Sequence, residues 1–123
     1  MEKKVLAFDF GASGGRAMCG TFDGEKISIE ELHRFSNDPV ILNGTMYWDV
    51  LRLFFEIKQG LIKAKKCGKI ESIGIDTWGV DFGLLDEEGR LLENPVHYRD
   101  SRTEGMAEES FKLIDKEKFY KIT

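Results

Sequence analysis

Residues 5–16 of this 123-residue chain read Val5-Leu6-Ala7-Phe8-Asp9-Phe10-Gly11-Ala12-Ser13-Gly14-Gly15-Arg16. A short apolar run carries one carboxylate, Asp9, into a turn made of small residues. A second apolar run, Ala17 to Phe22, follows at once. This pattern predicts two strands joined by a tight turn, with the carboxylate where the first strand ends.

The turn has the composition of an anion-binding site. Glycines allow backbone N–H groups to approach an anion closely, because no Cβ blocks the approach. Asp9 repels a phosphate unless a cation lies between them, and oxygen-ligated Mg²⁺ commonly does so in nucleotide sites. We therefore predict a magnesium–nucleotide site, although an ordinary structural hairpin turn explains the same residues. The chain contains no G-x-x-x-x-G-K-[ST] string, which excludes a Walker A loop.

Composition bounds the class of protein. A chain of 123 residues suffices for one domain with a core, and 41% hydrophobic with 33% charged residues is typical of globular proteins. The net charge of −4 argues against a nucleic-acid partner and an anionic membrane surface. The sequence shows neither a membrane-length apolar run nor a signal peptide, so we expect a cytoplasmic protein. Cys19 and Cys67 are expected to be free thiols.

The predicted elements follow an α/β order. We expect strands at 4–9, 16–22 and 26–35, the last two joined by a turn at Asp23-Gly24. A loop over 37–45 precedes a helix that begins after Asp49 and ends near Lys66. Strands at 70–75 (buried) and 80–85, a loop at 95–102, a helix to Leu113 capped by Ser101 or Thr103, and a helical piece at 117–121 complete the chain. This order suits a ribonuclease-H-like sheet in which strand 70–75 lies parallel beside the first strand.

Two patterns indicate which strand and helix faces are buried. Ile27, Ile29 and Leu32 carry the alternation of a half-buried strand. In the helix, apolar residues recur at helical spacing: Val50, Phe54, Ile57, Leu61 and Ala64, joined by Leu51, Phe55 and Ile62.

The end of strand 70–75 is the second candidate site. Asp76 and Asp81 bracket a Trp78-Gly79 turn, and parallel neighbouring strands bring their carboxyl ends to one crevice. We therefore expect Asp9 and the 76–81 segment to converge, although each aspartate could equally cap a turn. Trp78 is either a core anchor or a surface for the apolar face of a sugar, and Gly79 would let a ligand touch the backbone.

The two histidines have different surroundings. His33 lies at the end of a strand and is expected to be structural or on the surface. His97 belongs to Pro95-Val96-His97-Tyr98-Arg99-Asp100-Ser101-Arg102, which could hold a polar substrate or form a loop cross-linked by Arg–Asp pairs. The residues alone leave these two interpretations open.

Three motifs resemble a known family. The string D-F-G-A-S-G-G-R at 9–16 is similar to the first phosphate motif of the actin, hexokinase and heat-shock chaperone superfamily. S-I-G-I-D-T-W-G-V-D-F-G-L-L-D at 72–86 and P-V-H-Y-R-D-S-R-T at 95–103 resemble the FGGY carbohydrate kinases, in particular the subfamily that acts on L-rhamnulose. E-L-H-R-F-S-N at 31–37 and W-D-V at 48–50 also fit, so the resemblance spans the chain.

The resemblance implies a role for each matching residue. Asp9 would hold Mg²⁺ through water, and the ATP phosphates would lie along Ala12, Ser13, Gly14, Gly15 and Arg16. Gly79 would touch the ketose, while Trp78 and Asp81 would shape its pocket. The reaction would transfer the γ-phosphoryl group of ATP to the primary hydroxyl of L-rhamnulose, mainly by positioning and charge neutralisation.

Members of this family are far longer, with two ribonuclease-H-like domains around a cleft. The resemblance therefore implies that residues 1–123 are the N-terminal part of the first domain, an incomplete actin-like ATPase domain. The catalytic base is expected beyond Thr123, so this part alone would be inactive. Missing covering elements would leave the helix at 49–66 with exposed apolar surface through which the chain could self-associate.

Other functions fit some of the same residues. A kinase for a related ketose or polyol is the nearest alternative. A ribonuclease-H-like nuclease would use Asp9 and Asp76 in a two-metal site, and a nucleotide-switched binding protein would use the hairpin without a small substrate.

Overall fold

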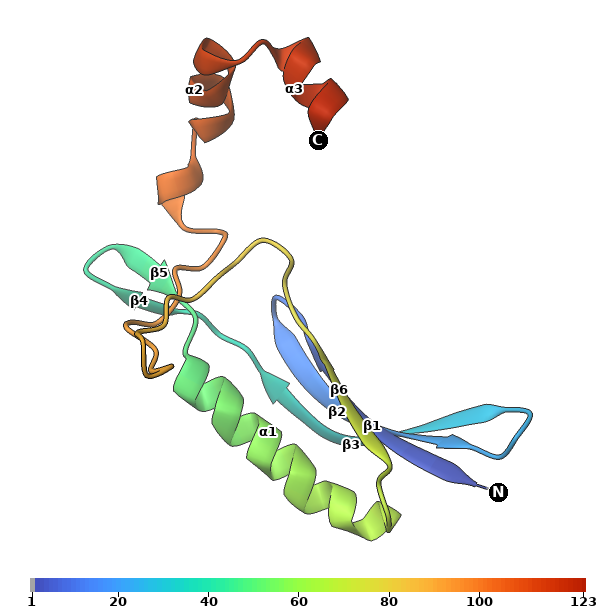
Figure 1. The fold of residues 1–123 in the computed structure, drawn as a ribbon. Helices are drawn as coiled ribbons and strands as arrows, with labels where there is room; N and C mark the ends of the chain where they lie inside the picture. The colour runs from blue at the N-terminus through green and yellow to red at the C-terminus, as the bar shows by residue number, and fades with distance from the viewer. Residues whose placement is uncertain (1) are drawn as a thin grey trace.

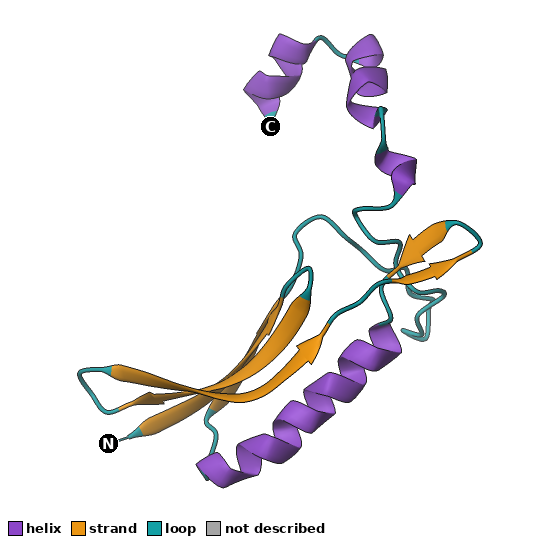
Figure 2. Cartoon of the chain, turned by 180° about the vertical axis from the view of Figure 1, so that it is seen from behind, coloured by secondary structure: helices purple, strands orange, loops and turns teal. Residues whose placement is uncertain are grey.

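The computed structural model describes residues 2–123, and its centre is a four-stranded sheet with one helix along one face (Figures 1 and 2). Strands β1 (Lys3–Phe10), β2 (Gly14–Phe22) and β3 (Ile27–Ser36) form successive antiparallel pairs. Strand β6 (Ser72–Asp76) lies parallel to β1, which gives the order β3-β2-β1-β6. The predicted hairpins and the parallel neighbour of the first strand are confirmed.

The core lies between this sheet and helix α1 (Val50–Ala64). Leu6 and Phe8 of β1 are each 1% exposed and face the helix. The helix approaches closely at Gly60, where an added Cβ would lie 2.5 Å from the Phe8 ring. Cys19 and Cys67 are free and buried in this core, as expected, and burial raises the pKa of Cys19 to about 11.

Helix α1 begins where the sequence predicts. The Asp49 carboxylate accepts a hydrogen bond from the Arg52 backbone N–H at 3.0 Å, which satisfies one of the free donors of the first turn. The helix ends at Ala64, followed by a 3₁₀ turn over Lys65–Cys67 and by Gly68 in the left-handed region.

The buried side of α1 differs from the apolar pattern of its sequence. The buried residues of the helix are Leu53, Glu56, Gly60 and Ala64, and Ile57 also packs against the core, so Ile57 and Ala64 of the predicted pattern are confirmed. Leu51, Phe54, Phe55 and Ile62 are 47–78% exposed, so apolar side chains also line the outer side. The helix therefore carries a second apolar surface that no element within residues 2–123 covers.

Glu56 is a charged residue on this buried side, and its partners explain how it is tolerated. Its carboxylate lies 2.5 Å from His33 Nε2 and 2.5 Å from Arg52 Nε, while Lys63 Nζ lies 2.8 Å from His33 Nδ1. Burial raises the pKa of Glu56, but the hydrogen bonds and charges of His33 and Arg52 outweigh it and lower the pKa overall. His33 thus has the structural role that the sequence predicts, linking β3 to α1.

Two predictions about strand burial are wrong. All five residues of β6 are exposed, because α1 packs over β2 and β3 and no other described element covers either face of β6, which is the edge strand of the sheet. Ile27 and Ile29 are 68% and 67% exposed, and only Leu32 of the predicted alternation is buried. The β2–β3 hairpin extends past the helix at its turn end, so that end of β3 has nothing to pack against (Figure 1).

The predicted strand at 80–85 is also absent. This segment pairs only at Leu85, in an isolated bridge to Leu91, and Val80, Phe82 and Leu84 are exposed. Its alternating apolar residues match a strand, but a strand needs a partner for its backbone groups, and no ladder forms here.

The predicted loop at 37–45 contains a small hairpin instead. Strand β4 (Val40–Leu42) pairs with β5 (Thr45–Tyr47) around Asn43-Gly44, and both turn residues have positive φ, at 52° and 81°. An Asn-Gly pair in this conformation is a strong hairpin turn, a signal that the loop prediction overlooked.

The C-terminal segment forms an arm that leads away from the sheet (Figures 1 and 2). The predicted cap is wrong: Ser101–Thr103 is a 3₁₀ turn capped by Asp100, and helix α2 (Met106–Leu113) begins after Gly105. Helix α3 (Lys116–Ile122) confirms the predicted final helical piece. Within residues 2–123, every helix is too short or too polar to cross a membrane.

Candidate functional site

Four charged residues form a row across one end of the sheet. Asp76, Asp9, Arg16 and Arg34 are successive register partners on β6, β1, β2 and β3. Side chains alternate along a strand, and Phe8 and Phe10 on either side of Asp9 are buried with the core beneath α1. The charged row therefore lies on the opposite face of the sheet from the helix.

The centre of the row is an ion pair between neighbouring strands. Arg16 Nη2 donates to Asp9 Oδ2 at 2.5 Å, and the two side chains are 43% and 42% exposed. Arg34 is paired instead with Glu31 on its own strand. The Asp9–Arg16 pair is thus half-open to solvent and stands directly beside the turn that joins the two strands.

The turn formed by residues 11–14, called here the glycine turn, is closed by backbone and side-chain hydrogen bonds. The Gly11 N–H donates to the Gly14 carbonyl at 2.9 Å. Asn37 donates from its side-chain amide to the Gly11 carbonyl at 2.9 Å and from its backbone N–H to the Ser13 carbonyl at 3.3 Å. Within residues 2–123, the N–H groups of Ala12 and Ser13 have no acceptor, so they can donate to an anion.

The glycines of this segment serve packing as well as approach. An added Cβ at Gly15 would lie 2.1 Å from the Phe35 ring, and one at Gly14 would lie 3.0 Å from the Phe35 carbonyl oxygen. Gly15 is fully enclosed, so the reason for a glycine there is the neighbouring strand, not a ligand. The anion-binding character of the segment therefore resides in the backbone of the turn itself.

The residues at this edge fit a Mg²⁺–phosphate group. Among the described residues, no three His, Cys, Asp or Glu side chains gather closely enough to enclose a metal ion. Mg²⁺ does not require such a cluster, because it is usually held by one or two carboxylates together with waters and phosphate oxygens. Asp9, with Asp76 as its register neighbour, offers that carboxylate next to the free N–H donors of the glycine turn.

A cluster of stacked rings forms the second part of the site. Trp48 stacks on Trp78 with 3.7 Å between ring centroids and on His97 with 3.8 Å, and Tyr98 lies against His97 at 4.7 Å. Phe10, next to Asp9 in β1, lies 6.4 Å from Trp78. The cluster connects the end of β1 that carries Asp9 to the loop at 95–103.

Asp81 is hydrogen-bonded to two residues of this aromatic cluster. Its Oδ2 atom accepts a hydrogen bond from Trp48 Nε1 at 2.5 Å and one from the Tyr98 backbone N–H at 3.3 Å. The structure therefore brings Asp76 to Asp9, as predicted, but directs Asp81 to the rings and not to Asp9. Within residues 2–123, Trp78 Nε1 is the one buried side-chain polar atom without a hydrogen-bond partner.

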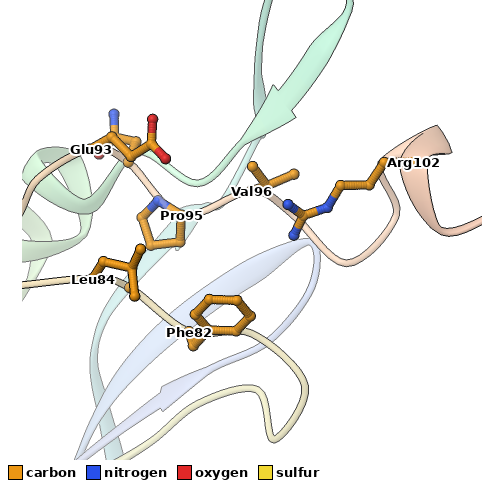
Figure 3. Close-up of a pocket in the computed structure, with 8 residues that line it drawn as sticks. Phe82, Leu84, Glu93, Pro95, Val96 and Arg102 are labelled. Carbon is orange, nitrogen blue, oxygen red and sulfur yellow. The ribbon is translucent and has the colours of Figure 1, made fainter.

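One cavity adjoins the cluster, and a second lies next to the first. One of about 130 Å³ is lined by Trp48, Val50, Leu53, Thr77, Trp78, Asp81, Phe82, Gly83 and Pro95. A second, of about 50 Å³, shares three of these residues and also borders Arg102, whose side chain extends towards Val96 (Figure 3). The Gly79 Cα faces open space, since an added Cβ would meet nothing within 4 Å.

The loop at 95–103 is cross-linked, one of the two interpretations of its sequence, but by backbone donors and not by Arg–Asp pairs. Asp100 is buried and accepts hydrogen bonds from the backbone N–H groups of Met46 and Arg102, which lower the pKa of its carboxyl. His97 is 1% exposed, and its Nδ1 accepts from the Arg99 N–H. Burial lowers the pKa of His97, and this outweighs the opposing effect of Asp81.

Two residues of the site were not identified from the sequence. Trp48 is the centre of the aromatic cluster, and its only sequence signal was its place in the W-D-V string. Asn37 closes the glycine turn from 26 positions away, and an asparagine before Asp38-Pro39 reads as an ordinary loop residue. Neither contact could be found without knowing which segments meet.

The chain is similar in sequence to known rhamnulokinases. No family model matches it. It is 46% identical to the rhamnulokinase of Oceanobacillus iheyensis over 98% of this chain and 26% of that protein. It is 50% identical to the rhamnulokinase of Halalkalibacterium halodurans over 94% of this chain and 25% of that protein. The chain thus spans about a quarter of the length of these relatives.

Solved structures show the same fold. A gluconate kinase from Lactobacillus acidophilus superposes with a TM-score of 0.76 at 14% identity, over 98% of this chain and 25% of that chain. A xylulose kinase from Rhodospirillum rubrum superposes with a TM-score of 0.73 at 16% identity, over 95% of this chain and 25% of that chain. The predicted α/β class and ribonuclease-H-like fold are thereby confirmed, over about a quarter of the length of these solved chains.

Proposed function

We propose, from the similarity of 94–98% of this chain to two rhamnulokinases, that it is the phosphate-binding wall of an ATP-dependent sugar kinase. The observation that carries the proposal is the glycine turn, whose Ala12 and Ser13 N–H groups lack acceptors within residues 2–123. Directly beside it, Asp9 offers a carboxylate for Mg²⁺ and Arg16 offers a cation for phosphate oxygens.

The proposed reaction transfers the γ-phosphoryl group of ATP to the primary hydroxyl of L-rhamnulose. Bound Mg²⁺ would neutralise charge on the phosphates, as it does in phosphoryl transfer generally. Asp9 would orient the metal-bound water, and the N–H groups of Ala12, Ser13 and Gly14 would donate to phosphate oxygens. The Arg16 guanidinium, which is paired with Asp9 in this structure, would also donate hydrogen bonds to phosphate oxygens. Gly15 would keep the turn close to β3, because the Phe35 ring leaves no room for a side chain at position 15.

The sugar side of the proposal rests on the aromatic cluster. Trp78 and Asp81 line the cavity of about 130 Å³, and Gly79, which follows Trp78 in the chain, has an uncovered Cα. Because one Trp78 face is stacked on Trp48, we propose that Trp78 shapes the pocket wall. Asp81 would act through Trp48 and Tyr98, which it positions.

The test is carried out on the complete kinase that contains this chain. Asp9→Asn removes the charge that holds the hydrated metal and should lower the rate of ATP-dependent L-rhamnulose phosphorylation about 10–100-fold, as loss of an outer ligand of a metal typically does. Raising the Mg²⁺ concentration should recover part of this loss. Asp38→Asn is the matched control, because Asp38 is exposed and outside the row, and it should leave the rate unchanged.

The same assays separate the alternatives. If the enzyme phosphorylates another ketose or a polyol faster than L-rhamnulose, that compound is the substrate. Metal-dependent cleavage of nucleic acid without sugar phosphorylation would favour the nuclease. Binding of ATP with no turnover of any sugar would favour a nucleotide-switched binding protein and contradict the kinase.

Two sequence-based expectations remain predictions. Self-association of the isolated chain would use the exposed side of α1, formed by Leu51, Phe54, Phe55 and Ile62, and sedimentation velocity would detect it. A cytoplasmic location also remains a prediction.

A further inference from the structure

We propose that Asn37 is a positioning residue that holds the glycine turn in its phosphate-binding shape. The inference rests on the proposed function, since it concerns how the same turn is oriented. Asn37 lies directly after β3, is 6% exposed, and stands 26 positions from Gly11 in the sequence. It would not touch the nucleotide and would act through the backbone of the turn.

Asn37 holds two carbonyls of the turn from one side. Its side-chain amide donates to the Gly11 oxygen at 2.9 Å, and its backbone N–H donates to the Ser13 oxygen at 3.3 Å. The second bond extends the β2–β3 pairing by one residue beyond Gly14 and Ser36. The side-chain bond, by contrast, exists only because residue 37 carries an amide.

Because the peptide bond is planar, these two contacts fix the direction of the neighbouring N–H groups. In a trans peptide the C=O and the following N–H point in opposite directions, and all peptide bonds of the described chain are trans. Holding the Gly11 carbonyl towards Asn37 therefore turns the Ala12 N–H away from it. In the same way, the bond to the Ser13 carbonyl turns the Gly14 N–H away.

The result is a turn whose Gly11 and Ser13 carbonyls are held on the side of Asn37, while the Ala12 and Gly14 N–H groups point away from it. The oxygens of Gly11, Ser13 and Gly14 are all engaged inside the hairpin, by Asn37 or by the Gly11 N–H. Donors that face outward attract phosphate oxygens, whereas an outward carbonyl would repel them. An amide at position 37 is suited to this task because it donates to an oxygen and carries no charge.

Substitutions at this position separate a donor from a mere space-filler. Asn37→Ala removes the donor and frees the Gly11 carbonyl. Asn37→Asp keeps the size of the side chain but places a negative acceptor beside that carbonyl and near the phosphates. Asp38→Ala is the control, because its side chain is exposed and has no hydrogen bond with the described residues.

The experiment is an isothermal titration of the complete kinase with MgADP, together with steady-state KM values for ATP and L-rhamnulose. One hydrogen bond contributes about 0.5–1.5 kcal/mol, so Asn37→Ala should weaken MgADP binding about 2–12-fold. Asn37→Asp should weaken it more than Asn37→Ala. We expect KM for ATP to rise in parallel, and KM for the sugar to stay within about twofold, since Asn37 does not line the cavity beside Trp78.

The stoichiometry of the titration keeps the result interpretable if a variant folds poorly. It counts the folded molecules, while the dissociation constant describes each of them. A lower stoichiometry with an unchanged dissociation constant in both variants would show a purely structural role and overturn the proposal. Lack of sugar phosphorylation by the unsubstituted protein would instead contradict the proposed function, so the two failures can be told apart.

Discussion

The glycine turn with its charged row and the aromatic cluster are built in opposite ways. Asp9 and Arg16 are seven positions apart, paired across one hairpin, and more than 40% exposed. The aromatic cluster joins Phe10, Trp48, Trp78 and His97 from four distant segments, and Trp48 and His97 are each 1% exposed. The difference suggests that the row supplies chemistry at little cost in stability, whereas the cluster supplies the stability that holds the loops in place.

The largest effect that tests this comparison is expected from Trp48→Ala. Removing a fully buried indole loses its burial and leaves a cavity, so the free energy of unfolding should fall by about 3–5 kcal/mol. Urea unfolding followed by circular dichroism measures this loss. Leu51→Ala is the control, because Leu51 lies three residues after Trp48, in the first turn of α1, and is 78% exposed. This substitution should change stability by no more than about 0.5 kcal/mol.

A smaller effect is expected from Asp81→Asn. The carboxylate accepts charge-assisted hydrogen bonds from Trp48 Nε1 and the Tyr98 N–H, and an amide oxygen accepts them more weakly. We expect a loss of about 1–2 kcal/mol in the same unfolding experiment. If Asp81→Asn is as stable as the unsubstituted protein, Asp81 does not stabilise the cluster. Its carboxylate would then be assigned to ligand binding in the cavity that it lines.

His97 should make the stability of the cluster depend on pH. Its pKa is below the ordinary value of 6.5, so between 6.5 and the lower folded value the unfolded chain binds more protons than the folded chain. Stability is therefore complete above pH 6.5 and falls as the pH drops below it, by at most about 1.4 kcal/mol per pH unit.

The measurement is the melting temperature between pH 7.5 and 5.5, a window that lies above the titration of the carboxylates. In His97→Asn the side-chain oxygen can still accept the Arg99 N–H, but no proton titrates, so the curve should flatten. An unchanged slope in this variant would assign the pH dependence to another group.

The smallest effect is expected from Arg16→Ala. Exposed ion pairs contribute at most about 1 kcal/mol, so stability should fall by less than this amount, and added salt should reduce the difference. A loss as large as that of Trp48→Ala would break the comparison, because the row would then be part of the structural framework.

The parts of the fold that were predicted correctly depend on neighbours in sequence. The strand–turn–strand pattern around Gly11–Gly14, the Asp23-Gly24 turn and the Asp49 cap are local signals, each explained by a few residues. The predicted partnership of Asp9 and Asp76 also held, because parallel strands align their carboxyl ends. The specific chemistry came from the resemblance of the motifs, not from spacing.

The errors arose where burial depends on what lies opposite. Ile73 and Ile75 look like core residues, but among the described residues no element packs over the faces of β6. The apolar side chains of α1 do not reveal which side meets the sheet, since both sides are apolar. Val80, Phe82 and Leu84 alternate as in a strand, yet no partner strand lies beside them.

From the sequence alone, the charge, the turn and the order of elements follow, because steric limits, capping and hydrogen bonds act over a few residues. Three features depended on the folded chain: Asn37 closing the glycine turn, Trp48 at the centre of the rings, and Gly60 rather than Phe54 against Phe8. Each is a contact between distant segments. Such contacts are selected by how whole surfaces pack together, and a local pattern carries no record of that.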